Sequence, residues 1–166
     1  MASLDDAIKI LKSGRLREGM EILEGLVRTE PENVNVLYNL GMCYSELGSI
    51  DKSIQTLEKC VKLAPEHANA LTALGFSYSR RGEQEKALGK LKAALEIDPD
   101  NFFALKNHGA VLAKLGRYGE AIASLERANR LLPDSPEILY GLALAHQEKG
   151  DTKTLARRSR NRVGSP

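Results

Sequence analysis

Residues 34–67 read VNVLYNLGMCYSELGSIDKSIQTLEKCVKLAPEH, and residues 68–101 read ANALTALGFSYSRRGEQEKALGKLKAALEIDPDN. Leucine, glycine, tyrosine and proline recur at the same places in both segments. The 34-residue interval extends over the whole chain in four columns of identical residues: Pro31, Pro65, Pro99 and Pro133; Gly14, Gly48, Gly82, Gly116 and Gly150; Leu37, Leu71, Leu105 and Leu139; and Leu23, Leu57, Leu91 and Leu125. Because all four columns keep one period without a slip, the chain is predicted to be a tandem array.

The apolar residues of one unit predict two helices. The first stripe, at helical spacing, consists of Leu37, Leu40, Gly41 and Tyr44. Gly48 follows, and a glycine there supplies the left-handed backbone conformation that ends a helix. A second apolar stripe runs over residues 50–64 and stops at Pro65, since proline cannot continue a helix. Because no segment alternates apolar and polar residues as a strand does, we expect an all-α chain without strands.

Small residues recur on both predicted helices of each unit. They are Gly41, Gly75, Gly109 and Ala143 on the first helix, and Ser53, Ala87 and Ala121 on the second. The side chains at a helix contact set the distance between the two axes, so small residues let the backbones approach closely. We therefore expect tightly packed helix pairs.

The composition is that of an ordinary globular protein. Of the 166 residues, 42% are hydrophobic and 28% are charged, which excludes a disordered chain. Tryptophan is absent and only 5% of the residues are aromatic, which favours a helical core over a β-sandwich. The longest apolar run, 138–145, is too short to cross a membrane, and the acidic start lacks a secretion signal. With two cysteines and no glycosylation sequon, a cytoplasmic protein is expected.

The repeated residues resemble the tetratricopeptide repeat (TPR) family. The family pattern is a Leu-Gly pair, a tyrosine three residues later, a small, a large and a small residue, and a closing proline. Three units match it: Leu40-Gly41, Tyr44, Ser53, Leu57, Cys60 and Pro65; Leu74-Gly75, Tyr78, Ala87, Leu91, Ala94 and Pro99; and His108-Gly109, Leu112, Ala121, Leu125, Ala128 and Pro133. His108 and Leu112 depart from the pattern, and leucine replaces the usual tryptophan throughout. The resemblance implies a right-handed α-α superhelix of antiparallel helix pairs, and it identifies no specific member.

The repeat register divides the chain into six predicted segments. They are an atypical first repeat at 1–33, repeats at 34–67, 68–101 and 102–135, a capping helix at 136–150 that forms a partial fifth repeat, and a basic tail at 151–166 that starts as a short helix and ends flexible. The capping helix is predicted to cover the fourth repeat through Leu139 and Leu142.

The first helix admits two registers. The strict 34-residue register puts Asp6 in the column of Leu40, a core position that disfavours a charge. A register displaced by one residue buries Leu4, Ala7 and Leu11 instead. We prefer the displaced register because an unpaired buried carboxylate is costly.

The resemblance also implies a binding surface, because in this family the first helix of each repeat lines the concave side of the superhelix. One column there is apolar where the family commonly has asparagine: Met42, Phe76, Ala110 and Leu144. The candidate peptide-binding groove comprises Asn35, Tyr38, Asn39, Met42, Asn69, Thr72, Phe76, Arg80, Phe103, Lys106, Asn107, Ala110, Lys114, Tyr140 and Leu144. Apolar residues supply affinity, and amides can both donate to and accept from a partner's backbone. The alternative is that these side chains pack against neighbouring helices.

The expected occupant of this groove is an extended segment or an amphipathic helix with spaced apolar anchors, from another protein or from a second copy of the chain. Arg80, Lys106 and Lys114 favour a ligand with some acidic groups in the second half of the array. Related proteins capture the acidic C-terminal tail of heat-shock chaperones with a clamp of lysine and asparagine. That clamp is absent, since the corresponding positions hold Tyr38 and Met42.

Other chemistries find little support in the sequence. No catalytic or nucleotide-binding motif is present, so neither an enzyme nor a cofactor is expected. His108 and His146 could meet across adjacent repeats as metal ligands, but no third ligand is evident, and we interpret both as core or boundary residues. Cys43 and Cys60 are interpreted as small core residues rather than as a disulfide or redox pair.

Basic residues gather near the end of the chain. Five of the 24 lysines and arginines lie between Lys153 and Arg162, which leaves 19 against 22 acidic residues elsewhere. No aromatic residue accompanies them, so a solvated terminus is favoured over a nucleic-acid site. The leading hypothesis is a non-enzymatic adaptor or scaffold that binds a partner in the groove. The alternatives are an accessory subunit of a larger complex that uses the convex face, or a tail that binds nucleic acid or a membrane surface.

Overall fold

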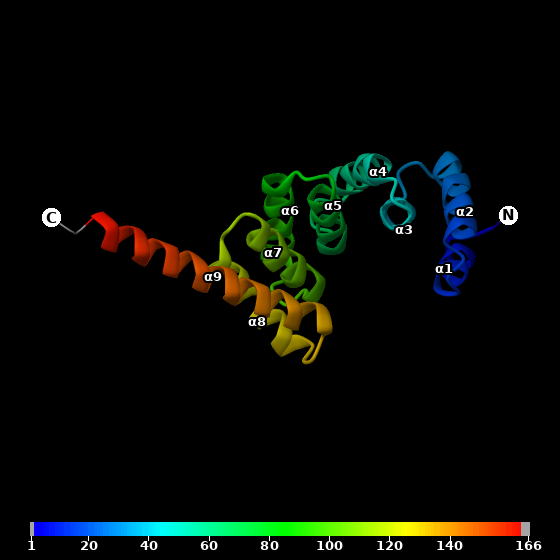
Figure 1. The fold of residues 1–166 in the computed structure, drawn as a ribbon. Helices are drawn as coiled ribbons and strands as arrows, with labels where there is room; N and C mark the ends of the chain where they lie inside the picture. Colours follow the sequence, from blue (N-terminus) through cyan, green and yellow to red (C-terminus); the bar gives the residue numbers. More distant parts are fainter. Residues whose placement is uncertain (1, 164–166) are drawn as a thin grey trace. The chain divides into compact units, whose positions relative to one another are not determined.

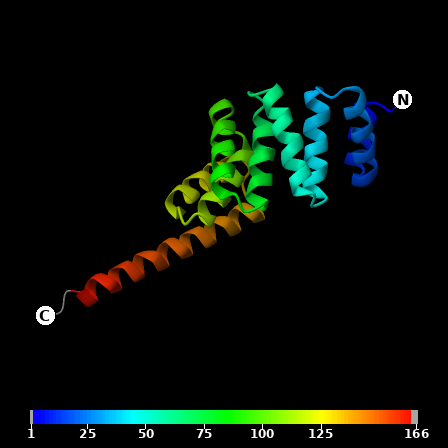
Figure 2. The same cartoon turned by 90° about the horizontal axis from the view of Figure 1, so that it is seen from above.

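The computed structural model describes the backbone of residues 2–163 and the side chains of residues 2–150. Every regular element in that part of the chain is a helix: α1 (Leu4–Lys12), α2 (Leu16–Thr29), α3 (Val34–Glu46), α4 (Ile50–Leu63), α5 (Ala68–Arg80), α6 (Gln84–Ile97), α7 (Phe102–Lys114), α8 (Tyr118–Leu131) and α9 (Pro136–Val163). The chain divides into two compact units, Met1–Pro99 with α1 to α6 and Asp100–Pro166 with α7 to α9. Inside each unit, loops of three or four residues join consecutive helices, which therefore run antiparallel (Figure 1 and Figure 2). The predicted all-α class is confirmed.

The turn inside each helix pair depends on a glycine with a positive φ. Gly48 has a φ of 81°, and the amide of Ser49 donates to the carbonyl of Tyr44 at 2.8 Å. This return bond satisfies a carbonyl at the end of α3, and any side chain would be strained at such a φ. Gly14, Gly82 and Gly116 take the same conformation. The helix ends predicted at Gly48, Gly82 and Gly116 are confirmed.

The two helices of a repeat touch where a glycine meets a leucine. A Cβ atom at Gly41 would lie 2.6 Å from the Cγ of Leu57, and one at Gly109 would lie 2.6 Å from the Cγ of Leu125. Gly75 and Leu91 repeat this contact at 2.7 Å. Each leucine therefore occupies the space that a larger residue on the first helix would need. The close approach predicted from the small residues is confirmed.

Each first helix presents one side to the repeat before it and another to its own second helix. Val36 and Cys43 of α3 pack in one cluster with Leu23 of the preceding pair. Leu37, one residue away from Val36, packs instead with Cys60 of α4 and with α5 of the next pair. A helix that continues the array therefore buries both sides, and a helix at the end buries one.

Hydrogen bonds from a tyrosine to a glutamate link consecutive repeats of the first unit. The hydroxyl of Tyr44 on α3 donates to the Oε1 of Glu24 on α2 at 2.7 Å, and the hydroxyl of Tyr78 on α5 donates to Glu58 on α4. Burial and, next, the bond to Glu24 raise the pKa of Tyr44 to about 12, so the phenol keeps the proton that it donates.

The first helix adopts the displaced register. Ala7 is fully buried, and Leu4 and Leu11 pack against the same cluster. Asp6 is exposed, and its carboxylate accepts from the backbone amide of Ser3 at 2.8 Å. Because the hydroxyl of Ser3 accepts in turn from the amide of Asp6, the two residues form a capping box at the start of α1. Asp6 therefore serves the helix end and not the core.

The last helix departs from the prediction. Gly150 does not have a positive φ, and α9 continues through it to Val163 as one helix (Figure 2). The prediction that the capping helix ends at residue 150 is therefore wrong, because the backbone stays helical beyond that residue. A glycine costs a helix interior only about 1 kcal/mol, and no proline follows to stop the helix before Pro166. The basic side chains expected to pack poorly beyond residue 158 lie outside the described residues.

The contact between α9 and the fourth repeat also differs from the expectation. Ile138 and Ala145 are fully buried, whereas Leu139 is 45% exposed and Leu142 is half-buried. Ile138 and Ala145 stand in the columns of Val36 and Cys43, the side that faces the preceding repeat. Leu139 stands in the column of Leu37, which needs a second helix to cover it, and α9 does not turn back to provide one.

Both cysteines are buried in the core of the first unit as free thiols. Cys43 packs toward the first repeat, and Cys60 packs with Leu37. Burial raises the pKa of each thiol to about 11, with a further contribution from Glu46 at Cys43. Both residues are small core residues, as predicted.

We expect Ile138→Ala to lower the free energy of unfolding by about 2–4 kcal/mol, because it leaves a cavity under α9. Leu139→Ala is the matched control and should cost about 0.5 kcal/mol or less, since Leu139 is largely exposed. Urea denaturation followed by circular dichroism at 222 nm measures both. Equal losses for the two variants would show that α9 packs through a different side.

We expect the two thiols to react slowly with a disulfide reagent in the folded protein at pH 8. A pKa of about 11 leaves only about 0.1% of each thiol as the reactive thiolate, and both sulfurs are buried. Absorbance of the released thiol, with and without denaturant, measures the reaction. Fast labelling of the native chain that Cys43→Ala or Cys60→Ala removes would contradict the burial.

Candidate functional site

Thirteen of the fifteen predicted groove residues lie on the first helix of a pair, and the other two lie on α9. Asn35, Tyr38, Asn39 and Met42 are on α3; Asn69, Thr72, Phe76 and Arg80 are on α5; Phe103, Lys106, Asn107, Ala110 and Lys114 are on α7; and Tyr140 and Leu144 are on α9. Eight belong to the first unit and seven to the second. Each unit therefore has its own candidate surface.

In the second unit, six of the seven residues line one groove of about 460 Å³ between α7 and α9: Lys106, Asn107, Ala110, Lys114, Tyr140 and Leu144. Leu125 of α8 closes its floor. Gly141 keeps that floor open, since a Cβ atom there would lie 3.2 Å from the Cδ1 of Leu125. Ala110 and Leu144 complete an apolar lining to which both outer helices contribute. We name this surface the α7–α9 groove.

The rim of the α7–α9 groove is charged on both sides. Lys106 and Lys114 lie on α7, and Glu137 and Glu148 lie opposite them on α9. The hydroxyl of Ser135 donates to Glu137 at 2.7 Å and, together with Lys106, keeps the pKa of Glu137 below its ordinary value. Lysines therefore line one wall and carboxylates the other, so the cations on which the predicted acidic ligand rests lie on the α7 wall alone.

Six lining residues of this groove were not among the predicted set: Ala113, Tyr118, Leu125, Glu137, Gly141 and Glu148. Glu137 shares the column of Asn35 and Asn69, so the repeat register could have identified it. Tyr118 and Leu125 come from a second helix, where the sequence gives no sign of exposure to a groove. The hydroxyl of Tyr118 lies 3.5 Å from the Oε2 of Glu148 and joins α8 to α9.

Phe103 is the one predicted residue of this unit that does not line the groove. It stands at the start of α7, packs edge-to-face on Phe102 at 5.3 Å between ring centres, and is largely exposed. The ammonium of Lys106 lies 5.7 Å from the centre of the Phe103 ring. Phe103 thus holds a lysine of the rim rather than extending the apolar floor.

In the first unit, Tyr38, Asn39 and Met42 line a smaller groove of about 300 Å³ between α1 and α3. Ile8 and Leu11 form its opposite wall. The side-chain amide of Asn39 donates to its own helix, at the carbonyl of Asn35, over 2.8 Å. That donor is therefore engaged, which weakens the expectation that Asn39 recognises a partner's backbone.

The α5 residues of the predicted set do not form one surface. Thr72 is buried, and its hydroxyl donates to the carbonyl of Ala68 at 2.9 Å, so it packs within the array. Phe76 is exposed, and the guanidinium of Arg80 lies 5.8 Å from its ring centre. Arg80 also donates to the carbonyl of Ser45 on α3. Phe76 and Arg80 thus make a local apolar and cationic pair.

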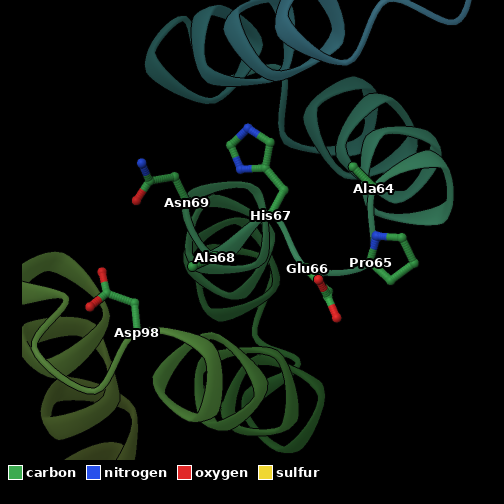
Figure 3. Close-up of a pocket in the computed structure, with 7 residues that line it drawn as sticks. All are labelled: Ala64, Pro65, Glu66, His67, Ala68, Asn69 and Asp98. Carbon is green, nitrogen blue, oxygen red and sulfur yellow. The ribbon is translucent and has the colours of Figure 1, made fainter.

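Asn69 lies in an open hollow of about 800 Å³ at the start of α5, with His67, Glu66 and Asp98 (Figure 3). The Nδ1 of His67 accepts from the amide of Ala70 at 3.1 Å and caps α5, while its ring stacks at 5.2 Å on Tyr38. In Figure 3 Glu66 points away from His67 and Asn69. The polar groups therefore do not converge on one point, as a small-molecule site requires.

Residues 2–150 contain no group of three or more histidine, cysteine, aspartate or glutamate side chains that could hold a metal ion. The Nδ1 of His108 lies 2.7 Å from the hydroxyl of Ser124 on α8, and His146 is exposed on α9. No helix in the described part of the chain is both long and apolar enough to cross a membrane.

Two family models match the sequence. The model described as "Tetratricopeptide repeat" matches residues 32–100, and the model described as "TPR repeat" matches residues 109–150. Together they cover well over half of the chain. No curated protein matches it.

Several solved structures share the fold. "MamA MSR-1 C2" is 29% identical with a TM-score of 0.75, and the match covers 90% of this chain and 86% of that one. "MamA AMB-1 C2221" is 27% identical with a TM-score of 0.73, covering 95% and 92%. TTC0263, a thermophilic TPR protein in Thermus thermophilus, is 26% identical with a TM-score of 0.75, covering 89% and 81%. These matches support a protein–protein interaction module in general, and the chain belongs to the tetratricopeptide repeat family.

Proposed function

We propose that the chain is a non-enzymatic adaptor whose principal binding surface is the α7–α9 groove. The observation that carries the proposal is the convergence of six groove residues, chosen from the repeat register and the family resemblance, on one apolar-floored groove with a charged rim. Grooves of this kind, with an apolar floor and a few placed polar groups, are where proteins hold peptide segments. The family supports protein partners in general.

The chemistry of the groove specifies its occupant. Ala110, Leu125 and Leu144 offer a floor for one or two apolar side chains, and the exposed ring of Tyr140 lines the same groove. The floor is short, so the occupant is a segment and not a folded surface. Buried apolar area is the main source of its affinity, and an interface this small fits a Kd of about 1 μM or weaker.

The charges of the rim favour one orientation of the bound segment. Lysines stand on α7 and carboxylates on α9, so a segment gains most when its acidic groups face Lys106 and Lys114 and its basic groups face Glu137 and Glu148. A segment with charges of one sign would meet a like charge on one wall. The preferred partner is therefore a segment of mixed charge with an apolar anchor between the two kinds of charge.

The first unit offers a second and smaller surface, made of Tyr38, Met42 and the wall of α1. Its apolar content suits one further anchor of the same partner or an independent segment. Phe76 with Arg80 provides another exposed apolar position on α5. We assign the first unit an auxiliary role because its amide Asn39 is bonded to its own helix.

Leu144→Lys is expected to weaken binding of peptides selected by the chain from a random phage-displayed library by at least about tenfold, because it puts a charge on the apolar floor. Leu63→Lys is the matched control: Leu63 is 40% exposed, close to the 41% of Leu144, and lies at the end of α4 outside every groove described. Fluorescence anisotropy of labelled peptides measures the affinities.

Two further variants sharpen that experiment. Lys114→Glu reverses a charge of the groove, so this variant should select peptides with basic residues where the parent chain selects acidic ones. Phe76 is exposed and does not line the groove, so Phe76→Glu should retain the fold and leave binding at the α7–α9 groove unchanged. A library without enrichment on the chain, or selected peptides that bind Leu144→Lys as well as the parent, would refute the proposal.

A further inference from the structure

The side of α9 next to the buried one carries a largely apolar stripe that no helix of the described residues covers. Its residues, at helical spacing, are Leu139, Leu142, Ala143 and His146. Leu139 is 45% exposed, Ala143 and His146 are exposed, and Leu142 is half-buried. We call this surface the outer face of α9, and it is separate from Tyr140 and Leu144 on the groove side of the same helix.

The repeats of the same chain show what covers this face elsewhere. Leu37, Leu71 and Leu105, in the column of Leu139, are all buried. Gly41, Gly75 and Gly109, in the column of Ala143, each lie against a leucine of the second helix of their own repeat, at 2.6–2.7 Å from an added Cβ atom. In every instance the cover is therefore an antiparallel amphipathic helix.

The covering helices share one stripe of small residue, leucine and small residue at positions i, i+4 and i+7. The three examples are Ser53, Leu57 and Cys60; Ala87, Leu91 and Ala94; and Ala121, Leu125 and Ala128, all of them buried. The small residues bring the two backbones together, and the leucine fills the space beside the glycine. This stripe is the chemical signature of a helix that fits the face.

The sequence after Gly150 does not contain this stripe in the repeat register. One repeat length beyond the third example stand Leu155, Ser159 and Arg162, which lack the central leucine. The backbone of α9 moreover continues as one helix to Val163 instead of turning back (Figure 1). The face is thus left open by the same feature that makes α9 long.

Ala143 in place of glycine does not prevent a helix from docking. Ala7, on the first helix of the first repeat, is fully buried in one cluster with Leu23 of α2. A leucine-bearing second helix therefore packs in one cluster with an alanine of a first helix within the same chain. The helix contact only needs to accommodate one methyl group.

We propose that the outer face of α9 is a docking site for an amphipathic helix of a partner protein that carries the small–x3–Leu–x2–small stripe. The partner helix takes the place of the second helix of the fifth repeat and runs antiparallel to α9. Leu139 and Leu142 are its apolar anchors, and Ala143 is its point of close approach. This site is independent of the α7–α9 groove, since the two surfaces use different sides of α9.

The probe for this site is a labelled peptide of residues 117–132, which contains α8 and its stripe. Titrated with the full chain, it should bind saturably and gain helicity, because an isolated helix of this length is marginal in water. Leu139→Lys and Ala143→Lys should each weaken binding by at least about tenfold, and Leu63→Lys should leave it unchanged. Leu125→Lys in the peptide should weaken binding equally.

Circular dichroism checks that each variant keeps its helices, and one folded α9 variant is enough for the test.

Three results would overturn the proposal. The first is binding that Leu144→Lys weakens and Leu139→Lys does not, which places the peptide in the α7–α9 groove. The second is binding that neither α9 variant changes, which means that the peptide exchanges with the chain's own α8. The third is a dimer of the chain alone in analytical ultracentrifugation that Leu139→Lys dissociates, which makes a second copy the occupant.

Discussion

In the second, third and fourth repeats the fold depends on the contact between a glycine on the first helix and a leucine on the second. At Gly41, Gly75 and Gly109 the leucine stands where a side chain would be, so the two backbones lie closer than a larger residue would allow. This contact sets the spacing of each pair, and the left-handed glycine at the turn lets the second helix return along the first. The other surfaces of a repeat are the sides of the two helices that do not face each other in this pairing.

The pairing leaves the first helices side by side, and that arrangement produces the grooves. In the second unit α7 and α9 form two walls, and the second helix between them contributes Leu125 to the floor. Leu125 thus packs against Gly109 in the core and also lines the groove, so core and binding surface meet at one residue. Gly141 on α9 keeps that leucine accessible. The proposed binding surface is therefore a direct product of the packing.

The three sides of the last helix, α9, lie in three different environments. Ile138 and Ala145 are buried against the preceding repeat, Tyr140 and Leu144 face the groove, and Leu139 and Ala143 are open. An internal first helix has the same three sides, but its third side is covered by the second helix of its own repeat. Because α9 continues as one long helix, the described residues include no second helix over its third side. Our two proposals assign a partner to each of its two accessible sides.

The 34-residue columns by themselves determined the helix pairs, the turns at Gly48, Gly82 and Gly116 and the small buried residues, because each depends on local backbone preference or on spacing along one helix. The helices that carry the candidate site were predicted from the family resemblance. Tertiary structure alone decided the rest. Thr72 is buried and Asn39 is bonded to its own helix, although their columns look exposed. Leu139 repeats a core leucine but lacks its cover, and Gly150 repeats a turn glycine but lies inside α9. A column records which residue occupies a position, whereas burial depends on whether another helix packs against that position, and no helix in the described part of the chain packs over Leu139 of α9.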